Sequence, residues 1–112
     1  MNVIILPEVL DYLEDLVITL YEKEYFGFLE TSTNYVQELL DNIQMDLPSF
    51  VSRPAPKYFD KYGKDMEYVV FKKNRRTHWY VFFRVYQANE DVIYQVRHIA
   101  NNHTTAQYFL TD

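Results

Sequence analysis

The chain has no cysteine, and only two glycines and four prolines occur among its 112 residues. The absence of cysteine excludes disulfide bonds and thiolate metal sites. The shortage of glycine and proline, together with 48% apolar residues, argues against extended disorder. Because this length is the usual size of one domain, we expect a single domain over residues 1–112.

Long apolar runs are also missing. No stretch of about 18 consecutive apolar residues occurs, so we expect no helix that spans a bilayer. The N-terminus lacks the basic start of an export signal, and Pro7 interrupts its apolar run. These features predict a soluble, cytoplasmic protein without membrane contact.

Signals for metals and cofactors are scarce. The sequence has no glycine-rich phosphate loop, no nucleophile elbow and no convincing Ser/His/Asp arrangement. His98 and His103 stand five residues apart, and no helical His/Glu pair completes a zinc ligand set. We therefore expect neither a metal nor a cofactor.

The charges are divided between the two halves of the chain, although the net charge is −5. Residues 1–52 carry ten acids and a single cation, Lys23, whereas residues 53–111 carry ten cations and five acids. This split predicts a dipolar molecule whose basic part can meet a polyanion and whose acidic part can meet a basic partner. The simpler alternative is an ordinary fluctuation of local charge.

Apolar spacing predicts a strand at residues 3–6, then an amphipathic helix from Pro7 to about Glu24. A turn around Gly27 and capping hydroxyls at residues 31–33 precede a second helix that ends near Gln44. Residues 46–63 contain three prolines and are interpreted as a long surface connection.

The remaining pattern has a period of two. Strands are expected at residues 67–71, 79–86 and 92–99, with turns at 74–76 and 87–91. The predicted fold class is α+β, in which a short N-terminal strand and a two-helix hairpin precede a three-stranded antiparallel meander. The helices should cover one face of a curved, four-stranded sheet.

Strand alternation predicts which side chains share a face. The row expected to face the helices consists of Trp79, Val81, Phe83 and Val85, with Val92, Tyr94 and Val96 from the last strand. The opposite, open face should carry His78, Tyr80, Phe82, Arg84 and Tyr86, with Gln95 and Arg97. Arg84 and Arg97 are therefore expected to lie on the same open face.

Cations and aromatic rings on one sheet face suit phosphates and stacked bases. The candidate residues for binding a nucleic acid or another target are Lys72, Lys73, Arg75, Arg76, Tyr80 and Tyr86. The simpler alternative is that these side chains keep an exposed sheet soluble. His98 and His103 could exchange protons near neutral pH, or could be ordinary solvated histidines.

Two stretches, Trp79–Val85 and Val92–Ile99, are similar to the paired strands that close the RelE/ParE toxins of bacterial type II toxin–antitoxin systems. The similarity includes a basic or histidine residue where the last strand ends, here Arg97 and His98. Polar residues at 101–103 and the tail to Tyr108 stand where the family often carries further site residues. The expected order of a strand, a helical hairpin and three strands extends the resemblance over nearly the whole chain.

The resemblance implies one of two toxic activities. RelE-like members cleave messenger RNA on the ribosome, whereas ParE-like members act on DNA gyrase. RNA cleavage needs cations for the phosphorane and groups that transfer protons. The resemblance assigns these roles to Arg84, Arg97, His98, His103 and Tyr108. Either activity implies a cognate antitoxin protein as partner. Whether the chain is an enzyme, a gyrase inhibitor or a non-catalytic protein-binding scaffold stays open, as does a homodimer.

Overall fold

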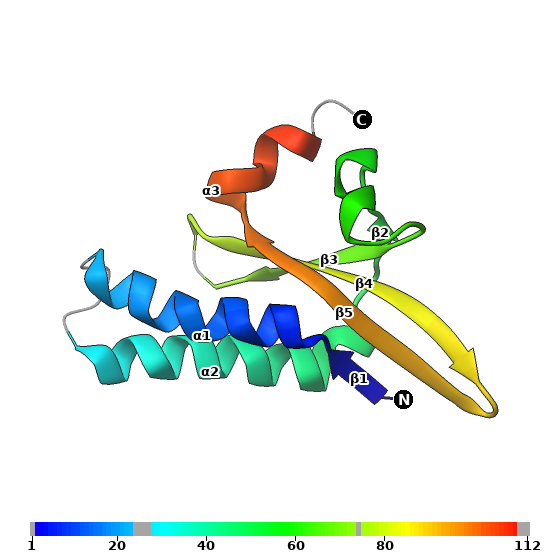
Figure 1. Cartoon of the computed structure of the whole chain (residues 1–112), viewed down its shortest axis with the longest axis horizontal. Coiled ribbons are helices and arrows are strands. Elements are labelled where there is room, and N and C mark those ends of the chain that lie inside the picture. The colour runs from blue at the N-terminus through cyan, green and yellow to red at the C-terminus, as the bar shows by residue number, and fades with distance from the viewer. Residues whose placement is uncertain (1, 24–27, 74, 110–112) are drawn as a thin grey trace.

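The computed structural model describes residues 2–23, 28–73 and 75–109. Its architecture is α+β, with two long helices packed on one mixed sheet (Figure 1). The elements, with η for a 3-10 helix, are β1 (Asn2–Ile5), α1 (Pro7–Glu22), α2 (Leu29–Asp46), η1 (Leu47–Ser49), β2 (Arg53–Pro54), η2 (Lys57–Tyr62), β3 (Glu67–Lys72), β4 (His78–Ala88), β5 (Asp91–Asn101), α3 (Asn102–Thr105) and η3 (Ala106–Phe109). None of the helices in these described ranges is long and apolar enough to cross a membrane.

The sheet has five strands in the order β1-β5-β4-β3-β2. Strands β3, β4 and β5 form the predicted antiparallel meander, and β1 pairs parallel with β5 from Asn2↔Ile93 to Ile5↔Val96. The prediction of four strands was wrong, because Arg53 and Pro54 add a fifth by pairing with β3. A strand of two residues inside a proline-rich stretch carries no alternating pattern that a sequence could reveal.

The β4–β5 hairpin extends past the end of β3, and β1 runs beside its β5 strand up to Ile93 (Figure 1). Pairing between β3 and β4 stops at Glu67↔Phe83, whereas pairing between β4 and β5 continues to Ala88↔Asp91. Asn89 has a φ of 57° at the tip, a left-handed conformation that asparagine tolerates better than most residues. The arm therefore presents residues of both strands away from the helices.

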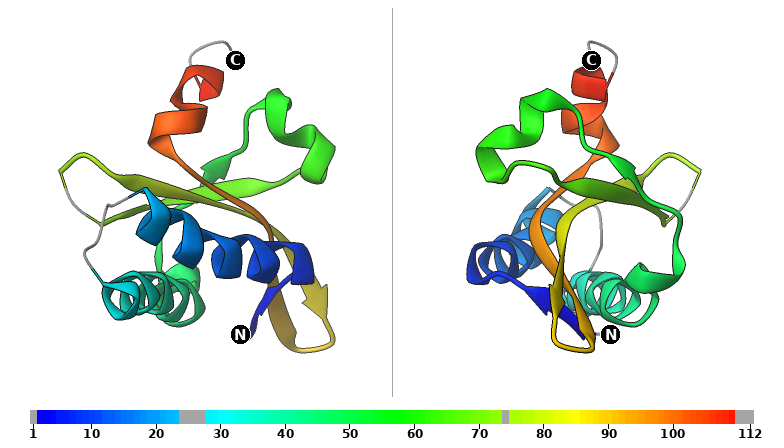
Figure 2. Two further views of the ribbon diagram at one scale, coloured as in Figure 1. Left: turned by 60° about the vertical axis from the view of Figure 1, so that its left-hand side comes forward. Right: turned by 90° about the vertical axis from the view of Figure 1, so that its right-hand side faces the viewer.

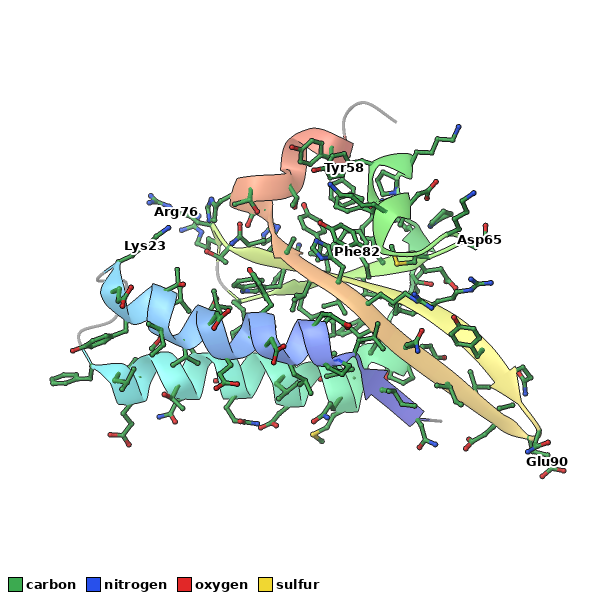
Figure 3. The ribbon with its side chains drawn as sticks, in the orientation of Figure 1. Lys23, Tyr58, Asp65, Arg76, Phe82 and Glu90 are labelled. Carbon is green, nitrogen blue, oxygen red and sulfur yellow. The ribbon has the colours of Figure 1, made fainter. Side chains whose placement is uncertain are left out.

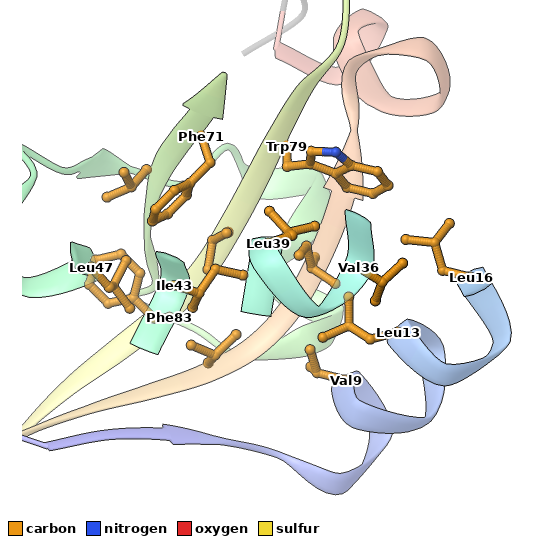
Figure 4. Packing of buried hydrophobic residues seen from close by; sticks show 14 residues of the cluster. Val9, Leu13, Leu16, Val36, Leu39, Ile43, Leu47, Phe71, Trp79 and Phe83 are labelled. Atoms are coloured by element: carbon orange, nitrogen blue, oxygen red, sulfur yellow. The ribbon is translucent and has the colours of Figure 1, made fainter. Parts of the chain in front are cut away.

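The helices pack on one face of the sheet through the predicted apolar stripes (Figure 4). Three- and four-residue spacing brings the buried side chains of each helix onto a single face. This helix-side core includes Val9, Leu13 and Leu16 from α1, Val36, Leu39 and Ile43 from α2, and Trp79, Val81 and Phe83 from β4. Val85, also expected there, is 38% exposed because it lies on the projecting part of the hairpin.

The start of α2 differs from the prediction. Its N-cap is Phe28, without a side-chain capping bond, and the helix begins at Leu29. Ser32 is fully buried and donates a hydrogen bond to the carbonyl of Val17 on α1 at 2.5 Å. Thr33 donates to the carbonyl of Leu29. The hydroxyls thus join the two helices or bond within α2 instead of capping it, and the expected turn at 24–27 lies outside the described residues.

The opposite face of the sheet is partly covered, so the expectation of an open face was wrong. Phe82 has no exposed surface, and it packs with the buried Phe59 of η2 and Met66. Phe109 of η3 completes the cover. Figure 2 shows η2 and the C-terminal helical segment on the side of the sheet away from α1 and α2. Residues 46–63, expected to form a surface connection, therefore supply part of a second core.

Candidate functional site

A β-bulge in β5 places the side chains of Arg97 and His98 on the same face of the sheet. Phe82 pairs with His98 while Phe83 pairs with Val96, so Arg97 is the extra residue. Val96 and His98 are therefore separated by one inserted residue, and alternation resumes beyond it. Val96 faces the helix-side core, whereas both Arg97 and His98 contact residues on the opposite side.

Arg84, Tyr86 and Arg97 form a group that we call the arginine–tyrosine cluster. The guanidinium carbon of Arg84 lies 5.3 Å from the centroid of the Tyr86 ring. Arg97 donates from Nη2 to the Tyr86 hydroxyl at 2.8 Å and from Nη1 to the carbonyl of Tyr62 at 3.5 Å. The two arginines thus lie on one face, and the cluster offers cationic and aromatic groups together at the base of the hairpin arm.

His98 lies against the face of Tyr62, with ring centroids 3.7 Å apart and planes 7° from parallel. Burial, aided by the Lys61 ammonium, lowers the pKa of His98 to about 4. The imidazole is therefore neutral near pH 7. A neutral imidazole can accept a proton but cannot supply one as an acid, so His98 is poorly suited to protonate a leaving group.

Tyr108 packs on the second core through Phe59, whose ring also contacts His98. The Tyr108 ring stacks on Tyr58 with centroids 3.6 Å apart, and the Lys61 ammonium lies 4.0 Å from the Tyr58 centroid. Hydrogen bonds from Lys61 and Tyr108 lower the pKa of Tyr58. Figure 3 shows Tyr58 close to the C-terminal helical segment, away from the hairpin arm that ends near Glu90.

His103 lies in neither group. It is exposed on α3, and its Nε2 is 3.4 Å from the hydroxyl of Thr77. It lines a cavity of about 350 Å³ together with Trp79 and residues of α1. The five residues that the resemblance assigned to catalysis are therefore distributed over three places, and only Arg84, Arg97 and the neighbouring His98 come together.

The candidate binding residues are also divided. Lys73 turns toward the helices, where its ammonium lies 3.2 Å from the Glu38 carboxylate. Lys72, Arg75 and Arg76 are exposed at the β3–β4 end of the sheet. Tyr80 is half-buried beneath Phe109, with ring centroids 4.5 Å apart. Burial raises the pKa of Tyr80.

Several residues near these groups were not predicted as site residues from the sequence. Tyr58, Lys61 and Tyr62 all come from η2, within the stretch interpreted as a loop. The run Tyr58-Phe59 followed by Tyr62 has the spacing of a short helical face between Pro56 and Gly63, and this signal could have revealed it. Tyr12 was missed because it belongs to a helix and lies near β5 only in the folded chain.

The described part of the chain holds no group of three or more histidine, aspartate or glutamate side chains that could bind a metal ion. No family model matches the chain, and neither the curated proteins nor the solved structures give a match. The protein therefore belongs to the α+β fold class and has a mixed sheet.

Proposed function

We propose that this protein is the toxin component of a bacterial type II toxin–antitoxin pair of the RelE/ParE kind, and that it acts by binding a protein target. DNA gyrase is the first target to test. The order of a strand, two helices and three long strands agrees with the resemblance and supports the proposal. The proposal places the protein in the bacterial cytoplasm, with a small antitoxin protein as its neutralising partner.

The observation that carries the proposal is the convergence of Arg84 and Arg97 on Tyr86. Arginine and tyrosine are enriched among residues that dominate protein interfaces. All three side chains of the cluster are partly exposed, so a protein surface can contact them.

Binding is favoured over RNA cleavage for two reasons. Cleavage by the ribose hydroxyl needs a base, an acid and cations within reach of one phosphate. His103 and Tyr108 make their contacts elsewhere, with Thr77 and Tyr58 respectively. In addition, Phe59 and Phe109 cover the middle of the sheet face on which a nucleic acid would lie.

The test is to induce the chain alone in bacteria and to follow growth, messenger RNA integrity and plasmid supercoiling together. Arg84→Ala removes a cation of the cluster, and Arg53→Ala removes an exposed arginine of β2 as a matched control. We expect growth arrest with intact messages and reduced supercoiling, abolished by Arg84→Ala and retained in Arg53→Ala. Purified protein should inhibit gyrase with the same dependence.

Three other results would overturn the proposal in different ways. Messages cleaved on the ribosome would identify an endoribonuclease instead. Growth arrest with normal gyrase activity and intact messages would exclude gyrase as the target. Unaffected growth would remove the toxin proposal and leave a non-catalytic protein-binding scaffold.

A further inference from the structure

A cavity of about 390 Å³ opens between the start of α1, η2 and the middle of β5. Val9 and Ile99, both almost fully buried, contribute apolar surface to it, with Leu6 beside them. The remaining lining residues are polar or aromatic: Glu8, Tyr12, Tyr62, Arg97 and His98. Three separate elements therefore meet around this cavity, and of its lining residues only Arg97 belongs to the arginine–tyrosine cluster.

The aromatic lining favours a flat ligand. Tyr62 and His98 stack on each other and form one rigid aromatic unit of the wall. Tyr12 adds a third ring from α1, and burial raises the pKa of its hydroxyl, which therefore stays protonated. Planar rings bind well between such surfaces because stacking and exclusion of water act together.

The polar lining offers both donors and acceptors. His98 makes no hydrogen bond through its ring nitrogens within the part of the chain that the structure describes, so a neutral imidazole offers one N–H and one lone pair. The Glu8 carboxylate is an acceptor only, and the Tyr12 hydroxyl can do either. Arg97 adds a guanidinium whose position is fixed by Tyr86 and Tyr62.

The charges around the cavity favour a ligand that is neutral at its ring. An anionic ring would meet the Glu8 carboxylate, and a cationic ring would meet the guanidinium of Arg97. Nucleobases are neutral, planar and rich in hydrogen-bonding groups. Guanine presents two neighbouring N–H donors that suit a carboxylate, together with two acceptors, O6 and N7, that suit an arginine.

We propose that the cavity formed by Glu8, Tyr12, Tyr62, Arg97 and His98 binds a guanine base. The base would lie on the aromatic wall, with N1–H and N2–H directed to Glu8 and its acceptor edge directed to Arg97. The inference does not rest on the toxin proposal. The same cavity could hold the base whether or not the protein binds gyrase or arrests growth. The guanine could belong to a free nucleoside or nucleotide, or to single-stranded RNA.

The test is calorimetric titration of the purified chain with guanosine, inosine, adenosine and cytidine. Inosine retains N1–H and O6 but lacks the N2 amine. Saturable binding of guanosine is expected, with inosine and adenosine each weaker by about tenfold or more. Two further arms use guanosine 5′-monophosphate and a short single-stranded RNA containing one guanine, compared with the same RNA containing adenine in its place.

Matched variants on α1 locate the site. Tyr12→Ala should weaken guanosine binding about tenfold, whereas Tyr21→Ala, at an exposed tyrosine of α1 outside the cavity, should not change it. Glu8→Gln should remove most of the preference for guanosine over adenosine, and Glu14→Gln should preserve it. Circular dichroism of each variant checks that α1 and the sheet remain folded.

The titrations distinguish the source of the base from a failure of the proposed site. Tighter binding of the guanine-containing RNA than of guanosine identifies RNA as the source of the base, and equal or weaker binding identifies a mononucleoside or mononucleotide; both support the site. Equal affinity for all the bases would overturn the proposal. So would a lack of saturable binding to guanosine, its monophosphate and the RNA, or binding that a folded Tyr12→Ala variant retains in full. None of these results depends on growth arrest or on gyrase.

Discussion

Arg97 and Tyr86 are joined across β4 and β5 by a hydrogen bond of 2.8 Å from Nη2 to the phenol oxygen. The other side of the arginine is limited by Gly63, where an added Cβ would stand only 2.8 Å from Arg97 Cδ. The inserted residue of the bulge is thus held from two directions. The fixed guanidinium is part of both proposed sites, because Arg97 belongs to the arginine–tyrosine cluster and also lines the cavity beside α1.

Gly63→Ala should destabilise the fold. Gly63 has a φ of 151°, a conformation that residues with a side chain rarely adopt, and its new methyl group would collide with Arg97. We expect a loss of about 1–3 kcal/mol in the free energy of unfolding. Chemical denaturation followed by circular dichroism measures it.

The Arg97→Ala background separates the two causes of this loss. Removal of the long side chain relieves the collision but leaves the backbone strain, so Gly63→Ala should cost less there than in the natural chain. Equal costs in both backgrounds would show that Arg97 does not lie against Gly63.

Truncation of a buried side chain in the second core should cost as much stability as truncation of one in the helix-side core. Phe59 is fully buried between the sheet and η3, so Phe59→Ala should cost about 3–5 kcal/mol in the free energy of unfolding. Leu39→Ala, at a fully buried position of α2, should cost about 2–5 kcal/mol. Urea denaturation of both variants provides the comparison.

The control for this comparison is Phe28→Ala, because Phe28 is 75% exposed. Its change should stay within about 0.5 kcal/mol. A similarly small effect of Phe59→Ala would mean that η2 does not pack on the sheet. The conclusion that Phe59 covers Phe82 would then be wrong.

The sequence predicted the helices and long strands well because their patterns are periodic and local. The stripes through Leu13 and Ile43, and the buried row Trp79, Val81 and Phe83, follow directly from spacings of 3.6 and 2 residues. Each of these segments is long enough for the pattern to repeat. Their packing on one another then follows from the need to bury the apolar sides.

The features that were missed depend on contacts between distant residues. Nothing local marks Arg97 as an inserted residue, since strict alternation along β5 would have turned His98 toward the helices. The burial of Phe82 follows from Phe59 and Phe109, which lie 23 positions before it and 27 after it in the sequence. The cavity beside α1 needs β5 and η2 to meet the first helix, and this arrangement exists only in the folded chain.

Ser32→Ala should weaken the contact between α1 and α2. The hydroxyl of Ser32 is fully buried and donates to the carbonyl of Val17, so its loss leaves that carbonyl without this partner in an apolar environment. We expect a cost of about 1–2 kcal/mol in the free energy of unfolding. Thermal and urea denaturation can both measure it.

Thr33→Ala is the matched control at the next position. Thr33 is exposed and its hydroxyl donates to the carbonyl of Leu29 within its own helix, so its replacement should change stability by about 0.5 kcal/mol or less. Equal effects of the two variants would indicate that the hydroxyls act through helix propensity and not through contact with α1.

His98 should make stability depend on pH between about 6.5 and 4. Its ordinary pKa of 6.5 is lowered to about 4 in the fold by burial and by Lys61. Above pH 6.5 the imidazole is neutral in both states and gives no pH dependence. As the pH falls below 6.5 the unfolded chain binds a proton that the folded chain refuses, so stability decreases until about pH 4, below which both states are protonated.

The size of this effect is limited by the partial exposure of the ring, and we expect about 1–2 kcal/mol across the window. Unfolding of the natural chain and of His98→Gln should be compared at pH 7 and pH 4.5, because the variant loses the part of the slope that His98 contributes. His103→Gln, at an exposed histidine of α3 outside the Tyr62 stack, is the matched control substitution. A nuclear magnetic resonance titration that placed the pKa of His98 near 6.5 would contradict the burial of its imidazole beside Lys61.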